Sequence, residues 1–188
     1  MKSLLICCMA ACWLSCNQAM HVSSAPVVVK GNPMLLGKIT VKQLDQPPFS
    51  DWYRREYAAY HPDGLVRDSL HALINTYRFE IFLGTWCGDS RREVPRLMKL
   101  LDQMGVKQSA VTIVALGNRD TLYKQSPAHE EQGKEIYRVP HLNIYRKGKE
   151  IGRITETPVK TWEKDMLAII RGELYVPKYP PKRLATAQ

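Results

Sequence analysis

The feature that most constrains the fold of this chain is an apolar run that leads, through a single cysteine, into an amphipathic stretch. The run covers residues 79–84, the cysteine is Cys87, and apolar residues recur at helical spacing over residues 91–104. This order predicts a buried strand, a tight turn and a helix, with Cys87 at the N-terminus of the helix. Such a terminus presents free backbone N–H groups and partial positive charge, which favour the reactive thiolate over the thiol.

The N-terminus has the pattern of an export signal. Lys2 supplies a positive charge, and residues 4–14 form an apolar run that is too short for a comfortable membrane span. The following Ser15-Cys16 resembles a bacterial lipobox, in which the cysteine is acylated and becomes the first residue of the mature protein. We therefore expect residues 1–16 to be a lipoprotein signal peptide with Cys16 as the lipidation site. Acylation at Cys12, ordinary cleavage near Ala19 and an uncleaved anchor are the alternatives.

Removal of the signal leaves about 170 residues, which is enough for one domain with its own core. Residues 17–33 are small and polar and are expected to form a flexible tether. Residues 34–172 are expected to form the domain, with its core in residues 78–172, and residues 173–188 an exposed tail rich in Pro and Lys. The net charge of +9 is spread along the chain without a dense basic block, which argues against nucleic acid and favours a solvated basic face. Attraction to an anionic membrane surface remains open.

The order of periodic segments predicts an α/β protein with one sheet and helices on both of its faces. Strands are expected at residues 34–41, 78–84 and 110–116, the last of them buried on both sides, and a hairpin at 142–154. Helices are expected to begin at Ser50 as an N-cap, near Leu65 and after Ser90, with a short one at 129–136 and a final one at 159–170. An aromatic stripe in the first helix is expected to pack on the core; it consists of Trp52, Tyr53, Tyr57 and Tyr60.

Several correctly spaced features resemble the thioredoxin family. Residues 86–90, Trp-Cys-Gly-Asp-Ser, correspond to the Trp-Cys-Gly-Pro-Cys turn of that family, and Pro95 stands where thioredoxins bend the active-site helix. Residues 136–140, ending in Val139-Pro140, resemble the stretch that ends in the family's cis-proline, and the hairpin at 142–154 follows as it does there. The resemblance covers residues 78–172, and residues 34–77 look like the amino-terminal extension of exported members. It implies a thioredoxin fold with a central mixed sheet.

The chain departs from the family pattern at three positions. Ser90 replaces the second cysteine, so the dithiol cycle is not available. The buried acid that thioredoxins use in proton transfer falls on Ile81, and the neighbouring Glu80 points to the opposite face of a strand. His141 stands where thioredoxins usually have Thr, and we expect it at the polar rim of the site.

The number and positions of the cysteines restrict the reactions that this chain can carry out. The other four cysteines, Cys7, Cys8, Cys12 and Cys16, all lie in the first sixteen residues, and an odd cysteine in an exported protein suggests intermolecular pairing or a free reactive thiol. Cys87 can attack a disulfide to form a mixed disulfide, whereas Ser90 cannot resolve it. We expect the Ser90 hydroxyl to hydrogen-bond the Cys87 thiolate, with Trp86, Gly88 and Asp89 completing the motif. Arg91 and Arg92 would favour the thiolate by charge, and Asp89 would oppose them.

Three functions are consistent with these residues. The first is monothiol thiol–disulfide exchange in the bacterial cell envelope, on envelope proteins with cysteines or disulfides or on an external thiol donor. The second is a binding module without catalytic activity that captures extended peptides at Val139-Pro140, a role that the resemblance implies. The third is a one-cysteine peroxidase, which ranks last because the Pro-x-x-x-Thr-x-x-Cys context is missing. We expect no cofactor and no metal, since no histidine shares a ligand spacing with Cys87.

Overall fold

The structure is a computed structural model that describes residues 27–29, 32–118 and 122–179. Its centre is a five-stranded mixed sheet with the strand order β3-β5-β4-β6-β7. The strands are β3 (Gly37–Ile39), β4 (Tyr77–Leu83), β5 (Val111–Ala115), β6 (His141–Arg146) and β7 (Lys149–Thr155). β4 and β5 are parallel, and the other neighbours are antiparallel. The mixed α/β class predicted from the sequence is confirmed, and the arrangement is consistent with a thioredoxin-like fold.

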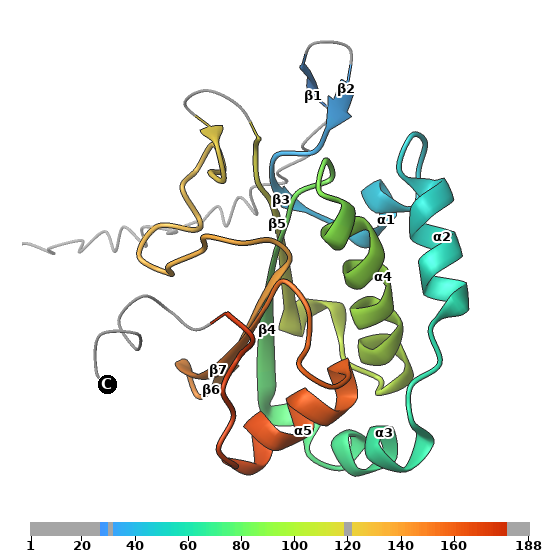
Figure 1. Ribbon diagram of the computed structural model, residues 1–188, viewed down its shortest axis with the longest axis vertical. Helices are drawn as coiled ribbons and strands as arrows, with labels where there is room; N and C mark the ends of the chain where they lie inside the picture. Colours follow the sequence, from blue (N-terminus) through green and yellow to red (C-terminus); the bar gives the residue numbers. More distant parts are fainter. Residues whose placement is uncertain (1–26, 30–31, 119–121, 180–188) are drawn as a thin grey trace, which may run out of the picture.

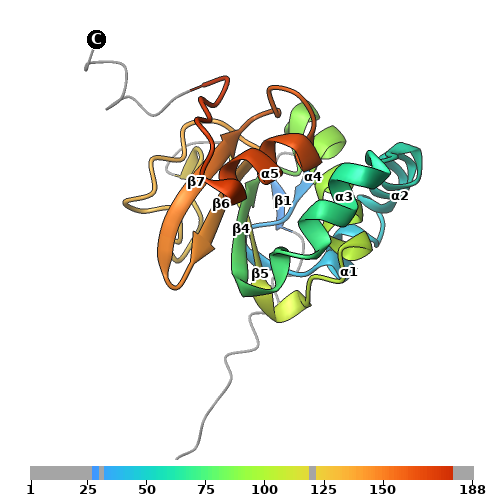
Figure 2. The ribbon, with the colours of Figure 1, turned by 90° about the horizontal axis from the view of Figure 1, so that it is seen from below.

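The described α-helices all lie on one side of this sheet, as the two views in Figure 1 and Figure 2 show. They are α1 (Val41–Leu44), α2 (Ser50–Ala59), α3 (Gly64–His71), α4 (Gly88–Gln103) and α5 (Trp162–Arg171), with short 3-10 turns η1 (Ile74–Thr76) and η2 (Gln108–Ala110). The other side is covered by irregular chain between β5 and β6, which we call the crossover segment (the described residues of 116–140). The expectation of helices on both faces is therefore wrong in this respect.

The crossover segment contains turns at the place where a short helix was expected. His129, Gly133 and Glu135 have φ values of 53°, 76° and 58°, in the left-handed region that a right-handed helix cannot contain. His129 N and Gln132 N donate to the carbonyls of Ser126 and His129 at 3.0 Å, which closes successive turns instead. The expected helix at 129–136 is thus replaced by a chain of turns.

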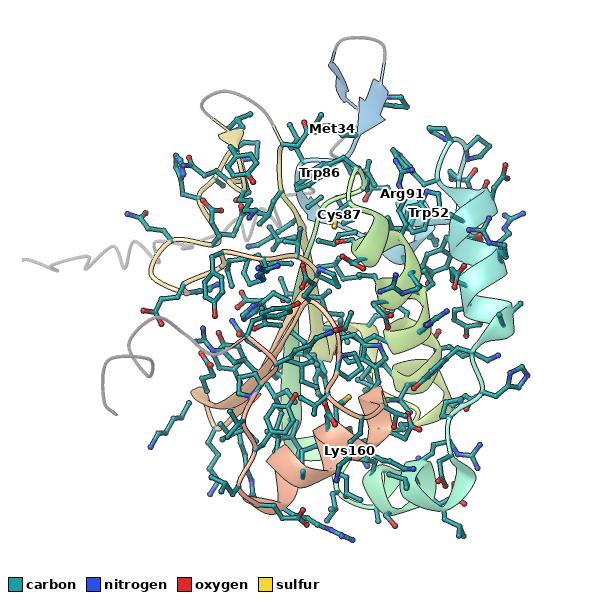
Figure 3. The ribbon with its side chains drawn as sticks, viewed as in Figure 1. Met34, Trp52, Trp86, Cys87, Arg91 and Lys160 are labelled. Atoms are coloured by element: carbon teal, nitrogen blue, oxygen red, sulfur yellow. The ribbon has the colours of Figure 1, made fainter. Side chains whose placement is uncertain are left out.

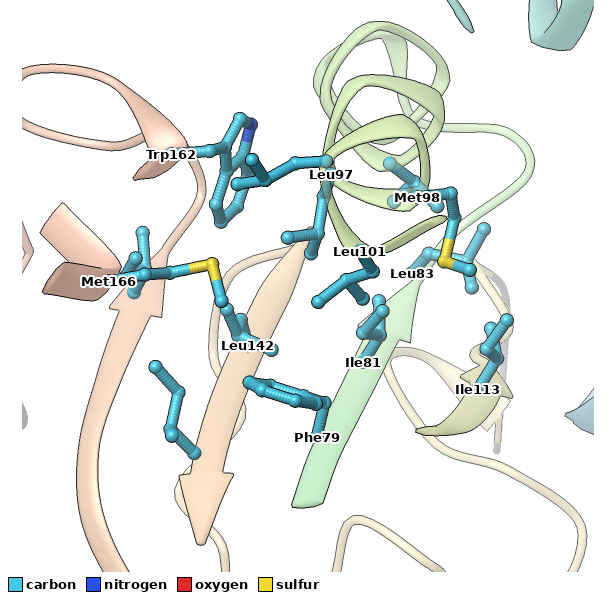
Figure 4. Close-up of a cluster of buried hydrophobic side chains, with 14 of the residues drawn as sticks. Phe79, Ile81, Leu83, Leu97, Met98, Leu101, Ile113, Leu142, Trp162 and Met166 are labelled. Atoms are coloured by element: carbon cyan, nitrogen blue, oxygen red, sulfur yellow. The ribbon is translucent and has the colours of Figure 1, made fainter. Parts of the chain in front are cut away.

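The core lies between the sheet and the helices (Figure 4). Alternate strand residues point toward α4 and α5 because side chains of a strand alternate between its faces. The figure labels the central members: Phe79, Ile81, Leu83, Leu97, Met98, Leu101, Ile113, Leu142, Trp162 and Met166. Each is at most 5% exposed, and burial of one such side chain is worth about 1.5–3 kcal/mol. The aromatic stripe of α2 joins this core, with Trp52 and Tyr53 buried and Tyr57 and Tyr60 partly buried, as expected.

Several element ends differ from the sequence expectation for local reasons. The first predicted strand ends at Ile39, because Thr40 and Gln43 form a capping box that begins α1. Ser50 is the first residue of α2 and not its N-cap, which is Phe49. Only the second half of β5 is buried on both sides, from Ile113 onward. The last helix begins at Trp162, because Thr161 caps it and the Asp165 carboxylate accepts from the backbone of the residues before the cap.

Described residues on either side of the central sheet in the sequence also form defined contacts. β1 (Val27–Val29) and β2 (Asn32–Met34) pair in antiparallel register within the stretch that we expected to be a tether. In the tail, Leu174 is 96% exposed, but Pro177 is buried and Tyr175 Oη donates to Asp165 Oδ2 at 2.9 Å. The tail is therefore less exposed than we expected as far as Tyr179. No helix in the described ranges has the length and apolar character needed to cross a membrane. Cys16 lies outside the described residues.

Candidate functional site

Cys87 occupies the N-cap position of α4, between the end of β4 and the first helical turn. Its backbone N–H donates to Gly84 O at 2.9 Å, and its carbonyl accepts from Arg91 N at 3.0 Å. The Sγ atom donates to the carbonyl of Val139 at 3.3 Å. The side chain is partly exposed, and Cys87 is the free cysteine within the described part of the chain. The strand–turn–helix placement predicted for Cys87 is thus what the structure has.

The Ser90 hydroxyl has a different partner from the one we expected. Ser90 is fully buried, and its Oγ accepts a hydrogen bond from the backbone N–H of Gly84 at 3.2 Å. The hydrogen bond of the thiol goes to Val139 O and not to Ser90. Ser90 therefore closes the turn by linking the end of β4 to the first turn of α4. This contact joins residues that are six positions apart, and no local sequence pattern predicts it.

The charges around the turn are largely balanced. Arg92 donates to Asp89 Oδ1 at 2.7 Å and to Glu93 Oε1 at 2.7 Å, so the carboxylate expected to oppose a thiolate is paired. Arg91 Nε donates to the carbonyl of Thr85 at 2.6 Å, which holds its guanidinium beside the turn. Figure 3 places Arg91, Trp86 and Cys87 close together at this end of the molecule.

Trp86 packs across the turn. Its indole Nε1 donates to the carbonyl of Leu116 at 2.8 Å, which ties the turn to the end of β5. A Cβ atom at Gly84 would lie 2.5 Å from Trp86 Cε2, so the indole occupies the space that a side chain at position 84 would need. Gly84 and Trp86 together set the shape of the surface next to Cys87. Gly88, the first residue of α4, has open space around its Cα.

Val139 and Pro140 lie directly before β6, on the crossover side of the sheet. The peptide bond between them is cis. The carbonyl of Pro140 accepts from Glu156 N at 2.6 Å, which holds this end of β6 to the residue after β7. Val139 is 3% exposed and packs in a small apolar cluster with Phe82, Val114 and Leu116, against which Trp86, Cys87 and Ile136 also lie. The structure thus brings the cysteine turn and the Val139-Pro140 segment together.

His141 is not at the rim of the site, contrary to our expectation. It is 1% exposed, because it pairs with Phe82 across the sheet on the face that the crossover segment covers. Nε2 lies 2.8 Å from Asn143 Oδ1, and Nδ1 lies 3.3 Å from Thr155 Oγ1. Burial lowers the pKa of His141 from 6.5 to about 4, although the hydrogen bond to Asn143 acts in the opposite direction. The imidazole is therefore neutral at neutral pH.

A chain of polar side chains that the sequence analysis missed continues from His141 along the same face. Asn143 Nδ2 donates to Tyr145 Oη at 3.4 Å, and Tyr145 Oη donates to Glu80 Oε2 at 3.0 Å. Glu80 also pairs with Lys134 of the crossover segment. The prediction that Ile81 and Glu80 face opposite sides is confirmed, since Ile81 lies in the helix-covered core. The signal in the sequence was the polar alternation at positions 141, 143 and 145, which marks one face of a strand.

Among the residues that the structure describes, no group of three or more His, Cys, Asp or Glu side chains could hold a metal ion. The chemistry available at this end of the molecule is that of one partly exposed thiol beside a backbone carbonyl.

Comparison with known proteins supports the fold. No protein-family profile and no curated protein matches the chain. A crystallised protein of unknown function from Pseudomonas aeruginosa matches with a TM-score of 0.52 and 14% identity over 72% of this chain and 93% of that one. An HIV epitope scaffold matches with a TM-score of 0.52 and 14% identity over 73% of this chain and 94% of that one. Thioredoxin f2 of Chlamydomonas reinhardtii matches with a TM-score of 0.31 and 20% identity over 47% of this chain and 73% of that one. At these identities the likeness concerns the fold alone.

Proposed function

We propose that this protein carries out thiol–disulfide exchange through Cys87 as a monothiol protein of the bacterial cell envelope. The observation that supports this most directly is the position of Cys87 at the N-cap of a helix of 16 residues, with its side chain partly exposed. A helix N-terminus stabilises negative charge within its first turn, and a thiolate is the nucleophile in disulfide exchange. The carboxylate of Asp89, which was expected to oppose the thiolate, is paired with Arg92 at 2.7 Å.

The exchange has two steps. The Cys87 thiolate attacks one sulfur of a partner disulfide, a new S–S bond forms, and the other partner sulfur leaves as a thiolate. Ser90 cannot take the place of a resolving cysteine, and its hydroxyl is already bonded to Gly84 N. Release therefore needs an external thiol, which attacks the mixed disulfide, returns Cys87 as thiolate and itself becomes disulfide-bonded to the partner. A captured chain would align with the Val139-Pro140 segment, beside the partly exposed Cys87.

The second candidate is a binding module without catalytic activity that holds an extended peptide at Val139-Pro140. The observation that favours it is the hydrogen bond of the thiol to Val139 O, which occupies the sulfur in the absence of a partner. In this case Cys87 would contribute packing, since free cysteine is often buried and inert.

The location in the cell is proposed from the N-terminal residues. We propose that the signal peptide ends before Cys16, that Cys16 is lipidated, and that the domain faces the periplasm with no nucleic-acid partner. Replacement of Cys16 by Ala should release soluble or unprocessed protein, measured by detergent partition and mass spectrometry of the amino terminus. Wild-type protein in the aqueous phase with an unmodified amino terminus would contradict lipidation.

The test of the exchange reaction is covalent trapping. Non-reducing electrophoresis of envelope extracts should show mixed disulfides for the wild type and for Asp89→Asn, which keeps the thiol, and none for Cys87→Ser. In parallel, mass spectrometry of the peptide that contains Cys87 should show rapid alkylation by iodoacetamide. If Cys87→Ser gives the same pattern as the wild type, no covalent intermediate forms at this residue, and the binding module becomes the better candidate.

A further inference from the structure

The polar chain behind the thiol site has a defined direction. Three β6 side chains on the face covered by the crossover segment, His141, Asn143 and Tyr145, each hydrogen-bond the next. Tyr145 then donates to Glu80 on β4, which Lys134 of the crossover segment also contacts. Such a chain polarises each of its members in the same sense, and it is strengthened by exclusion from water.

This chain fixes the protonation of the imidazole. With Asn143 Nδ2 directed to Tyr145, Asn143 Oδ1 can only accept, so His141 Nε2 carries the hydrogen. His141 Nδ1 then accepts from the hydroxyl of Thr155 on β7. Both ring nitrogens are thus satisfied in one neutral tautomer, at a position that is 1% exposed.

The charged groups near this ring do not favour a second proton. Arg153 on β7 disfavours the imidazolium by charge. Glu80 is paired with Lys134 at the far end of the chain, and Arg138 is paired with Glu156 beside the cis bond. Cys87, on the turn before α4, packs against the same cluster as Phe82, the cross-strand partner of His141.

The His141 ring lies next to the backbone segment that contacts the Cys87 thiol. His141 directly follows Pro140, and Val139 O is the acceptor of the Cys87 Sγ hydrogen bond. A shift of the first residue of β6 would carry the carbonyls of Val139 and Pro140 with it. Movement of about 1 Å in such a site can cost as much as 100-fold in rate.

We infer that His141 is a positioning residue of the thiol site. Held between Asn143 and Thr155, its neutral imidazole fixes the start of β6 and with it the Val139 backbone along which a captured chain aligns. His141 touches neither the partner nor the sulfur in this role. The inference rests on the proposed exchange reaction, and it assigns to the position after the proline a function in alignment.

The first experiment compares two reactions of Cys87 in the full-length protein. Iodoacetamide needs only the thiolate, whereas a short peptide that carries a 2-thiopyridyl disulfide must also align with Val139. In His141→Leu, which removes both hydrogen bonds, the ratio of peptide rate to iodoacetamide rate should fall by about tenfold. In His141→Gln, whose amide can donate to Asn143 and accept from Thr155, the ratio should stay within about threefold of wild type.

The matched control is Ile144→Val, which loosens the same strand on the helix-covered face and should leave the ratio unchanged. Unfolded molecules react without alignment and would also lower the ratio, so this control shows how much a loss of stability alone contributes. If His141→Leu and His141→Gln both keep the wild-type ratio, the positioning role is overturned and the exchange reaction stands. If the wild type reacts with iodoacetamide and not with the peptide, the proposed exchange fails and the positioning role fails with it.

The second experiment measures the tautomer directly. Nitrogen-15 chemical shifts of the His141 ring at pH 7 should show a protonated Nε2 and an unprotonated Nδ1. Thr155→Val should move the Nδ1 resonance, because it removes the hydroxyl donor, and should leave Nε2 protonated. A cationic ring or a protonated Nδ1 in the wild type would overturn the arrangement from which the positioning role is argued.

Discussion

The two faces of the central sheet are built from the same strands but differ in the side chains that they carry. On the helix-covered face, apolar side chains from β4, β5 and β6 meet α4 and α5 in one continuous core. On the face covered by the crossover segment, a small apolar cluster around Phe82 adjoins the polar chain from His141 to Glu80. Apolar packing has no preferred direction, whereas hydrogen bonds fix orientation. The comparison teaches that the first face supplies most of the stability and the second face fixes the surroundings of Cys87.

This division explains where the candidate site lies. Cys87, Trp86 and Val139 all pack with the cluster on the crossover side, although Cys87 begins a helix that covers the other side. The turn between β4 and α4 therefore directs Trp86 and Cys87 to the crossover side while it leads the chain into a helix on the other side.

The largest expected effect compares two phenylalanines of β4 on opposite faces. Phe79 and Phe82 are both at most 1% exposed. Phe79→Ala should lower the free energy of unfolding by about 4 kcal/mol and Phe82→Ala by about 3 kcal/mol, since irregular chain can relax into a cavity better than packed helices can. Urea denaturation measures both. A greater loss for Phe82→Ala would reverse the ranking of the two faces.

The second prediction concerns the buried imidazole. His141 has a folded-state pKa of about 4 against 6.5 when unfolded, so the unfolded chain binds more protons as the pH falls from 6.5 to 4. Stability should therefore be lost over this range, by about 3 kcal/mol more in the wild type than in His141→Gln. Urea denaturation at a series of pH values gives the difference, in which the carboxylates common to both proteins cancel. Parallel curves for the two proteins would show that His141 is not buried as a neutral ring.

The smallest expected effect comes from a comparison of two ion pairs, one on each side of the sheet. Lys134 and Glu80 have side chains that are 30% and 15% exposed, whereas Lys164 and Asp63, on the helix-covered side, are 45% and 40% exposed. Lys134→Met should lower the free energy of unfolding by about 0.5–1 kcal/mol at low salt. The loss should be smaller at 1 M salt, because salt weakens an ion pair that is only partly buried. Lys164→Met should have no measurable effect on unfolding by urea. Equal effects of the two substitutions would remove the distinction between the faces for ion pairs.

The sequence predicted those parts of the fold that local periodicity determines. The strand–turn–helix around Cys87 and the hairpin of β6 and β7 follow from alternating and helical spacing, and both are confirmed. The turns of the crossover segment were predictable only in part: Gly133 is a turn residue, whereas the positive φ values at His129 and Glu135 occur in residue types that do not mark a turn. The wrong prediction that His141 lies at the rim of the site followed from the wrong prediction for the crossover segment. A residue after the proline is at the rim only if nothing covers that face.

The partner of Ser90 shows a second limit. A hydroxyl three residues after a cysteine at the start of a helix is close enough in spacing to reach the sulfur. The sequence shows this spacing, and the prediction for Ser90 rested on it. The competing acceptor role toward Gly84 N depends on how β4 ends, which is a tertiary property. Pairings between strands and turns are thus the part of a site that spacing does not determine.

The hydrogen bond from Leu35 N to Thr85 Oγ1, at 3.2 Å, has a mechanical consequence. Leu35 and Thr85 are both fully buried, and Thr85 stands two residues before Cys87. Chain that enters the domain at this point is thus fastened to the cysteine turn itself. Leu35 also belongs to the core between the sheet and the helices, so tension applied from the N-terminal side would load the cysteine turn and that core together. A pull on the N-terminal side would thus act on the surroundings of the thiol as well as on the core.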